Sequence, residues 1–143
     1  MKHKPASRKT GLRRLLKLAD YVANLPRERF NFSHFVSSDW KGTIDFSCGT
    51  TACALGWATT MPFFRNLGLH LSRYGQPTLG HFSFTRINKT IFALEQNEAD
   101  NLFIFGAPTP ENRSGIDTPK EWARYARRFV AHARRQLKCN HLT

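Results

Sequence analysis

The stretch of the chain in which chemistry could reside covers residues 45–64 and reads DFSCGTTACALGWATTMPFF. It contains Cys48 and Cys53, and the first of these stands where polar residues give way to an apolar run. A thiolate at the start of a helix is stabilised by the helix dipole and by unpaired N–H groups. Cys48 is therefore the candidate nucleophile of a cysteine-dependent hydrolase.

A thiol enzyme also needs a general base, and no histidine of this chain stands in a recognisable catalytic context. The histidines weighed for that role are His34, His70, His81 and His132. Small residues recur through the cysteine segment at intervals that suit close helix packing, and a free cysteine packs as a small hydrophobe. We therefore favour a packing role for the segment and expect a non-enzymatic protein.

The same segment could bind an anion through its backbone. If a helix starts there, the N–H groups of Gly49, Thr50 and Thr51 are free to hold a phosphate. The surrounding residues lack the spacing and the lysine of a nucleotide-binding phosphate loop. The two cysteines also lack the second ligand pair of a zinc site. We expect no metal and no cofactor.

The charge balance points to an anionic partner. The 143 residues include 22 Lys and Arg against 10 Asp and Glu, a formal net charge of +12. Such a field favours nucleic acids, nucleotides or acidic protein surfaces.

The apolar runs are too short for the ~20 residues that a membrane span needs. Three cysteines and the lack of a secretory signal favour a reducing cytoplasm.

Most of the positive charge lies near the two ends of the sequence, in residues 1–17 and 120–138, where Glu121 is the one acidic residue. Cations three or four residues apart on a helix repel by a few tenths of a kcal/mol per pair, and an anionic partner would offset that cost. The candidate binding residues in these segments are Arg13, Arg14, Lys17, Arg124, Arg127 and Arg128.

Hydrophobic periodicity predicts a mainly α fold. A first helix is expected from Thr10 to Leu25, before Pro26, and a buried helix over residues 52–60. Pro62 either breaks that helix or starts a further turn, which residues 66–68 stop. Helices are also expected over residues 84–92 and after an N-cap at Asn97. The sequence Thr118-Pro119-Lys120-Glu121 opens a final helix of about five turns.

The remaining residues complete a small orthogonal helical bundle with an irregular, aromatic-rich connector over residues 27–46, in which residues 43–46 are expected to form a short strand. Residues 74–77 and 106–119 read as loops. We expect a flexible basic arm over residues 1–9, a single helical domain over residues 10–138 and a tail over residues 139–143.

The pattern CGTTACALGWA resembles a family of small, uncharacterised bacterial and phage proteins with a CGTxACxxGxA core. Flanking motifs follow in the same order, from Phe30-Asn31-Phe32 to Glu98-Ala99-Asp100-Asn101-Leu102-Phe103 and Thr118-Pro119, so that the resemblance spans roughly residues 12–130. The family often has histidine where this chain has Trp57. The resemblance implies a phage-type or bacterial accessory protein, without an activity to transfer.

These observations predict capture of an anionic partner, with a nucleotide-type signalling molecule, sequestered against a host defence, as the leading hypothesis. One alternative is sequence-nonspecific DNA or RNA binding through the basic terminal helices. Others are an acidic host protein surface and the hydrolase that uses Cys48. The sequence leaves the oligomeric state open.

Overall fold

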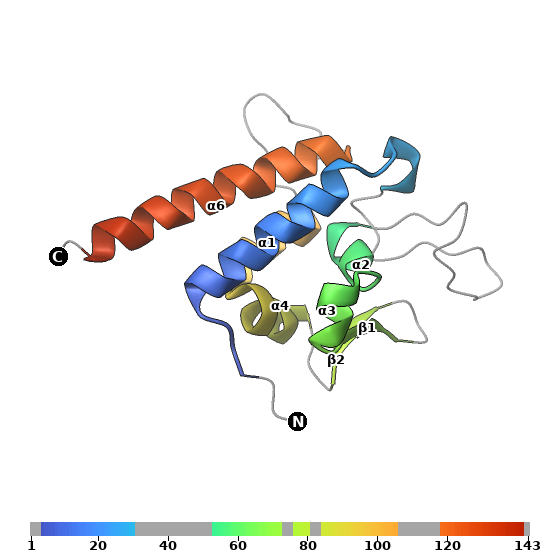
Figure 1. Cartoon of the computed structure of the whole chain (residues 1–143), viewed down its shortest axis with the longest axis horizontal. Helices are drawn as coiled ribbons and strands as arrows, with labels where there is room; N and C mark the ends of the chain where they lie inside the picture. The colour runs from blue at the N-terminus through green and yellow to red at the C-terminus, as the bar shows by residue number, and fades with distance from the viewer. Residues whose placement is uncertain (1–3, 31–52, 73–75, 81–83, 106–117, 142–143) are drawn as a thin grey trace.

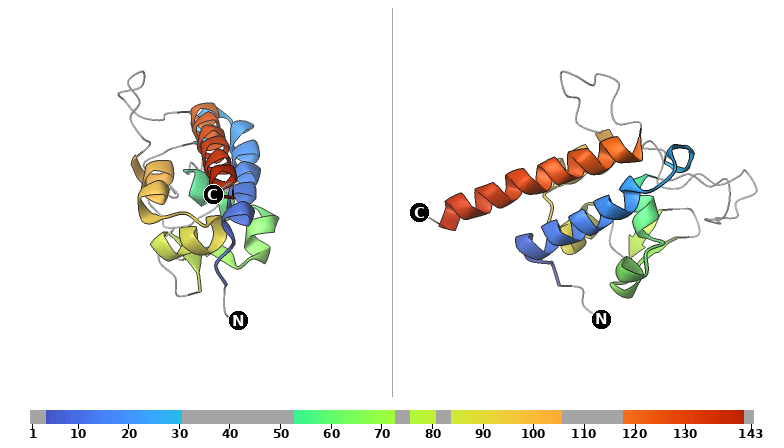
Figure 2. Two further views of the ribbon diagram at one scale, coloured as in Figure 1. Left: turned by 90° about the vertical axis from the view of Figure 1, so that its left-hand side faces the viewer. Right: turned by 45° about the horizontal axis from the view of Figure 1, so that its top comes forward.

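The computed structural model describes residues 4–30, 53–72, 76–80, 84–105 and 118–141. Within these ranges the chain is predominantly helical, which confirms the predicted mainly α class. Two long helices, α1 (Arg8–Ala23) and α6 (Pro119–His141), lie side by side and run antiparallel, as Figures 1 and 2 show. Shorter helices pack against other sides of α1, so the bundle is built around an antiparallel pair.

The other elements are short and lie between the two long helices in the sequence. They are η1, a 3-10 turn (Arg27–Arg29), α2 (Ala54–Ala58), α3 (Pro62–Asn66), β1 (Leu69–Leu71), β2 (Pro77–Leu79), α4 (Phe84–Phe92), α5 (Gln96–Asp100) and η2, a π-helical turn (Asn101–Phe105). The strands form an antiparallel hairpin that pairs Leu69 with Leu79, and this hairpin was not predicted. Three residues are too few to display an alternating pattern.

Helix α1 begins at Arg8, two residues before the helix start predicted at Thr10. The Ser7 side chain caps the helix by accepting a hydrogen bond from the backbone N–H of Thr10. The N–H of Ala6 donates to the carbonyl of Thr90 at 2.9 Å. Residues 6–9 thus belong to the folded body instead of a free arm, because the cap and this bond fix them.

Helix α6 opens as predicted, since the backbone N–H of Glu121 donates to Thr118 Oγ1 at 3.1 Å. It continues to His141, so residues 139–141 of the predicted tail are helical. Helix α5 is capped by Glu95 and not by Asn97, because the Glu98 carboxylate accepts the N–H of Glu95 at 2.9 Å.

The buried helix predicted over residues 52–60 is the five-residue helix α2, all of which is buried. Pro62 starts the separate helix α3, and Gly68 follows it with a φ of 103°, as a stop signal requires. The predicted strand at residues 43–46, most of the connector and the loop at residues 106–117 lie outside the described residues.

A chain of aromatic rings runs through the core and joins the short helices to α6. Phe64, Phe92, Phe103 and Trp122 follow one another with ring centroids 5.5 to 5.8 Å apart. The Trp122 indole N–H donates to the carbonyl of Leu102 at 2.6 Å, which satisfies the one polar atom of this buried ring. The rings therefore position α3, α4 and η2 against the inner side of α6.

Helices α1 and α4 make backbone contact at Gly11. A Cβ atom at Gly11 would overlap the carbonyl group of Phe92 and would lie 2.8 Å from the Cβ of Ala93. Ala93 has a φ of 53°, and its successor Leu94 donates to the carbonyl of Asn88, which is the pattern of a helix C-cap normally made by glycine. The end of α4 is thus fitted directly onto the first turn of α1.

Arg8 fastens the same junction. Its guanidinium forms two hydrogen bonds to the Glu98 carboxylate, at 2.7 and 2.8 Å, and a third to the carbonyl of Ala93 at 2.8 Å. It also lies over the ring of Phe129, 5.6 Å from the centroid. One side chain therefore ties α1 to the end of α4, to α5 and to α6.

We expect Gly11→Ala to lower the free energy of unfolding by about 1–3 kcal/mol, because the added methyl group has no space. In an ordinary helix interior the same change stabilises by about 0.5–1 kcal/mol. The test is therefore whether Gly11→Ala lowers or raises the free energy of unfolding. Urea unfolding measures it, with Lys9→Ala at an exposed position of α1 as the control. Stabilisation by Gly11→Ala would contradict the close contact.

We expect Glu98→Gln to destabilise the protein by about 1–2 kcal/mol near neutral pH, because the charge-assisted bonds to Arg8 weaken. Burial raises the pKa of Glu98, but the bonds from Arg8 and the Glu95 N–H outweigh it and hold this pKa below its usual value.

A carboxyl whose pKa is depressed by folding contributes stability above its unfolded pKa and loses it as the pH falls through its folded pKa. The difference between wild type and Glu98→Gln should therefore shrink between about pH 7 and about pH 3 in urea unfolding. A difference that does not change with pH would contradict the ionic pairing.

Candidate anion-binding surface

Helix α6 carries its positive charge along one side. Its apolar side chains, among them Trp122, Ala126 and Val130, are buried against the core. With about 100° per residue, the cations fall within an arc of about 120° on the other side, and Ala131 is the one uncharged residue on that arc. From end to end the arc is about 27 Å long. This α6 cationic stripe consists of Lys120, Arg124, Arg127, Arg128, Arg134, Arg135 and Lys138, all exposed.

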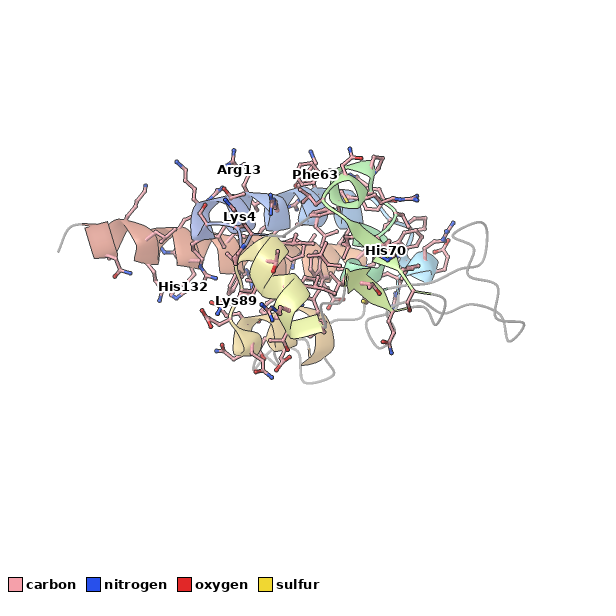
Figure 3. All side chains as sticks on the ribbon, turned by 90° about the horizontal axis from the view of Figure 1, so that it is seen from below. Lys4, Arg13, Phe63, His70, Lys89 and His132 are labelled. Atoms are coloured by element: carbon pink, nitrogen blue, oxygen red, sulfur yellow. The ribbon has the colours of Figure 1, made fainter. Side chains whose placement is uncertain are left out.

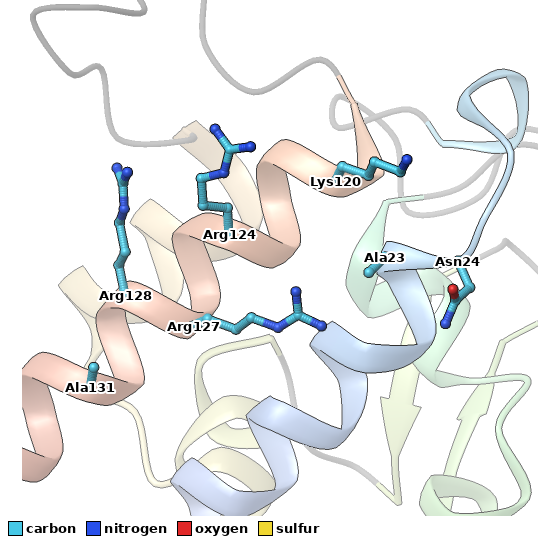
Figure 4. A pocket seen from close by; sticks show the side chains of 7 residues that line it. All are labelled: Ala23, Asn24, Lys120, Arg124, Arg127, Arg128 and Ala131. Atoms are coloured by element: carbon cyan, nitrogen blue, oxygen red, sulfur yellow. The ribbon is translucent and has the colours of Figure 1, made fainter.

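The first half of the stripe borders an open groove between α6 and the end of α1, seen from close by in Figure 4. Arg124 and Arg128 project away from α1, whereas Arg127 reaches across toward it. Among the described residues, no carboxylate pairs with Lys120, Arg124 or Arg128. This α6 groove has a volume of about 590 Å³ and is lined by Ala23, Asn24, Lys120, Arg124, Arg127, Arg128 and Ala131.

Arg127 forms an ion pair with Asp20 of α1, with 2.8 Å between Nη2 and Oδ1. The two side chains are 48% and 71% exposed. Exposed pairs of this kind contribute about 0–1 kcal/mol, so a stronger anion can take the place of the carboxylate. Asp20 is thus a replaceable counterion at the border of the α6 groove.

A second groove lies on the α1 side of the same ion pair. Figure 3 shows Arg13 and Phe63 projecting from one side of the molecule. The ammonium group of Lys17 lies over the Phe63 ring, 4.7 Å from its centroid. This α1 groove has a volume of about 530 Å³ and is lined by Thr10, Arg13, Arg14, Leu16, Lys17, Asp20 and Phe63.

The three basic candidates on α1 are not equivalent. Arg13 and Lys17 are exposed, whereas Arg14 is half-buried and donates to the carbonyl of Ile91 at 3.0 Å. That carbonyl lies at the end of α4, where helix carbonyls lack intrahelical partners. Burial, and then the charge of Arg13, lowers the pKa of Arg14. Arg14 therefore serves the contact with α4, and Arg13 and Lys17 remain as the accessible cations.

The two grooves meet along α1. Arg13, Lys17, Asp20 and Asn24 stand at successive turns of the helix and form one exposed row. Asp20 lines the α1 groove, and its partner Arg127 lines the α6 groove. The structure therefore brings the two predicted basic groups onto adjoining parts of one surface.

Among the described residues of the cysteine segment, none is placed as a nucleophile. Cys53 immediately precedes α2 and is buried, and this burial raises its pKa to about 11. Trp57 is buried and donates its indole N–H to the carbonyl of Arg29 at 2.9 Å. Cys48, Gly49, Thr50 and Thr51 lie outside the described residues, so their roles stay predictions.

Other kinds of site find little support in the described ranges. Within them, no group of three His, Cys, Asp or Glu side chains is placed to hold a metal ion. No helix among them is both long and apolar enough to span a membrane. His132 is exposed on α6, and His70 is exposed on β1 with its Nδ1 3.0 Å from the carbonyl oxygen of Gly68.

Comparison of the chain with known protein families, curated proteins and solved structures found no match. The resemblance of the cysteine motif to small bacterial and phage proteins therefore remains a prediction from the residues alone. The chemistry of the surface has to be inferred from its own geometry.

Two residues of this surface were missed in the sequence. Phe63 belongs to the apolar run 61–64 and was read as core, but its side chain is 37% exposed. Asp20 was not singled out, although it stands seven residues after Arg13, which places both on one side of α1. An acidic residue in a strongly basic helix was the signal by which Asp20 could have been found.

We expect iodoacetamide at about pH 8 to modify Cys139 and to leave Cys53 unmodified, because the thiolate is the reactive form. Cys139 is exposed near the end of α6, whereas Cys53 is buried with a raised pKa. Peptide mass spectrometry distinguishes the two, and a urea-unfolded sample provides the control in which both react. Rapid labelling of Cys53 in the folded protein would contradict its burial.

Proposed function

We propose that this protein binds the phosphate backbone of nucleic acid, with the α6 cationic stripe as the principal contact. The observation that carries the proposal is the row of seven exposed cations on one side of a single helix. Arg127 pairs there with Asp20, and the cations beside it have no ion pair within the described part of the chain. A surface of this kind is matched by a ligand with regularly repeated negative charge.

The length of the stripe favours a polymer over a compact anion. About 27 Å of cationic surface corresponds to about eight phosphates of one strand at about 3.4 Å each. The α6 groove is open, and the described residues that line it include no aromatic side chain that would hold a base. These features support phosphate contact without sequence readout.

A nucleotide-type ligand is the second candidate, and the α1 groove is what favours it. That groove combines the exposed ring of Phe63 with the cations Arg13 and Lys17. Small-molecule sites commonly join an apolar surface to a few convergent polar groups. A mononucleotide could use this groove, but it would leave most of the α6 stripe without a ligand.

We expect the affinity for a 20-nucleotide oligomer, which is longer than the α6 cationic stripe, to fall steeply with salt. Neutralising about five phosphates gives a slope of log K against log salt near −4. The double change Arg124→Gln and Arg128→Gln should weaken binding at least about tenfold and lessen the slope by about two. Fluorescence anisotropy at several salt concentrations measures both.

The matched control is Lys89→Glu, on an exposed position of α4, which changes the net charge by the same amount. It should alter the affinity far less than the double change on α6. Asp20→Asn should tighten binding by about two- to fivefold, since Arg127 is released from a pair worth under about 1 kcal/mol. Equal losses for the control and the double variant, or no binding at low salt, would overturn the proposal.

A further inference from the structure

We propose that the nucleic acid is single-stranded and that one of its bases stacks on Phe63 in the α1 groove. This inference rests on the proposed function and specifies its ligand. It concerns a different residue and a different groove from the α6 contacts, so the two can be tested separately.

The aromatic ring of Phe63 lies at the protein surface in a defined orientation. Its side chain is 37% exposed, whereas its neighbour Phe64 is completely buried in the core. The two rings meet edge to face, with centroids 5.1 Å apart and planes at 89°. Because Phe64 is packed in turn against Phe92, this contact holds the Phe63 ring at a defined angle.

The cations around the ring suit a nucleotide that belongs to a strand. Lys17 lies over the Phe63 ring, and Arg13 stands one helical turn away on α1. A stacked base brings its own phosphate to the same place, and that phosphate can draw the Lys17 ammonium group off the ring. In this exchange the ring loses its cation–π contact with Lys17 and gains a stacking contact with the base.

The strand has a continuous path from this ring to α6. Asp20 lines the α1 groove and binds Arg127 of the α6 groove, so the two grooves share a border. Backbone phosphates on the α6 stripe and a base at Phe63 can therefore belong to one molecule. Figures 3 and 4 show the two parts, with Phe63 and Arg13 in one and Arg124 to Arg128 in the other.

Stacking on an exposed ring favours single-stranded over double-stranded nucleic acid. The bases of a duplex are paired and stacked on each other, so their faces are not accessible to a protein side chain. In a single strand a base can leave its neighbours and stack on an aromatic ring at little cost. Every base has such a face, so this contact adds affinity without strong sequence preference.

The experiment compares three polymeric probes, which are a 20-nucleotide single strand, its duplex and inorganic polyphosphate, and adds a free mononucleotide as a fourth ligand. Each is titrated against wild type, Phe63→Leu and Phe63→Trp. Leucine keeps an apolar side chain without an aromatic face, and tryptophan restores the face. Thermal unfolding of each variant establishes that the fold is retained.

We expect wild type to bind the single strand at least about fivefold more tightly than the duplex, and Phe63→Leu to lose at least about fivefold for the single strand alone. Phe63→Trp should restore the wild-type affinity, and polyphosphate binding should not change in either variant. If all three probes bind through Arg124 and Arg128 but Phe63→Leu changes nothing, the stacking inference fails and the proposed function stands.

Three other outcomes overturn the inference. Equal affinity of wild type for duplex and single strand would show that base faces are not used. Tight binding of a free mononucleotide that depends on Phe63, with no gain for the oligomer, would replace the strand by a nucleotide ligand. If no probe binds at low salt, both this inference and the proposed function fail.

Discussion

The backbone contact between α1 and the end of α4 is the constraint on which the rest of the structure depends. Gly11 allows this contact because it has no side chain, and Arg8 secures it by bridging to Glu98 and Ala93. With α4 on one side and α6 on another, α1 keeps an exposed row that runs from Arg13 to Asn24. Both grooves of the candidate surface border that row.

The helices that carry long apolar stripes could be predicted from the sequence, because burial imposes a regular spacing on them. Both α1 and α6 were found this way, and the capping residues of α6 were also identified. Among the shorter elements, α4 was also predicted with its observed bounds, whereas the hairpin of β1 and β2 and the cap of α5 were not. Asn97 was chosen as the cap for its residue type, whereas the cap that forms pairs Glu95 with Glu98, which Arg8 also holds from a distant part of the chain.

The basic residues of the candidate surface were predictable as exposed, because an unpaired charge is rarely buried. Their assembly into adjoining grooves was not predictable, since it follows from the antiparallel packing of α1 on α6. Arg14 illustrates the difference. It has the same charge as Arg13, but its position on the helix directs it to the carbonyl of Ile91. The aromatic part of the surface was not predicted. Phe63 lies in an apolar run and was therefore expected to be buried.

The pairing of α1 with α6 also determines when this protein can fold. Residues 24–118 separate the two helices, so their contact closes a loop that contains most of the chain. Contacts so distant in sequence slow folding, and during synthesis α1 has to wait for α6 to leave the ribosome. Until then the side of α1 that packs on α6 lacks its partner. The newly synthesised chain therefore exposes an apolar side of a cationic helix, which a chaperone can cover.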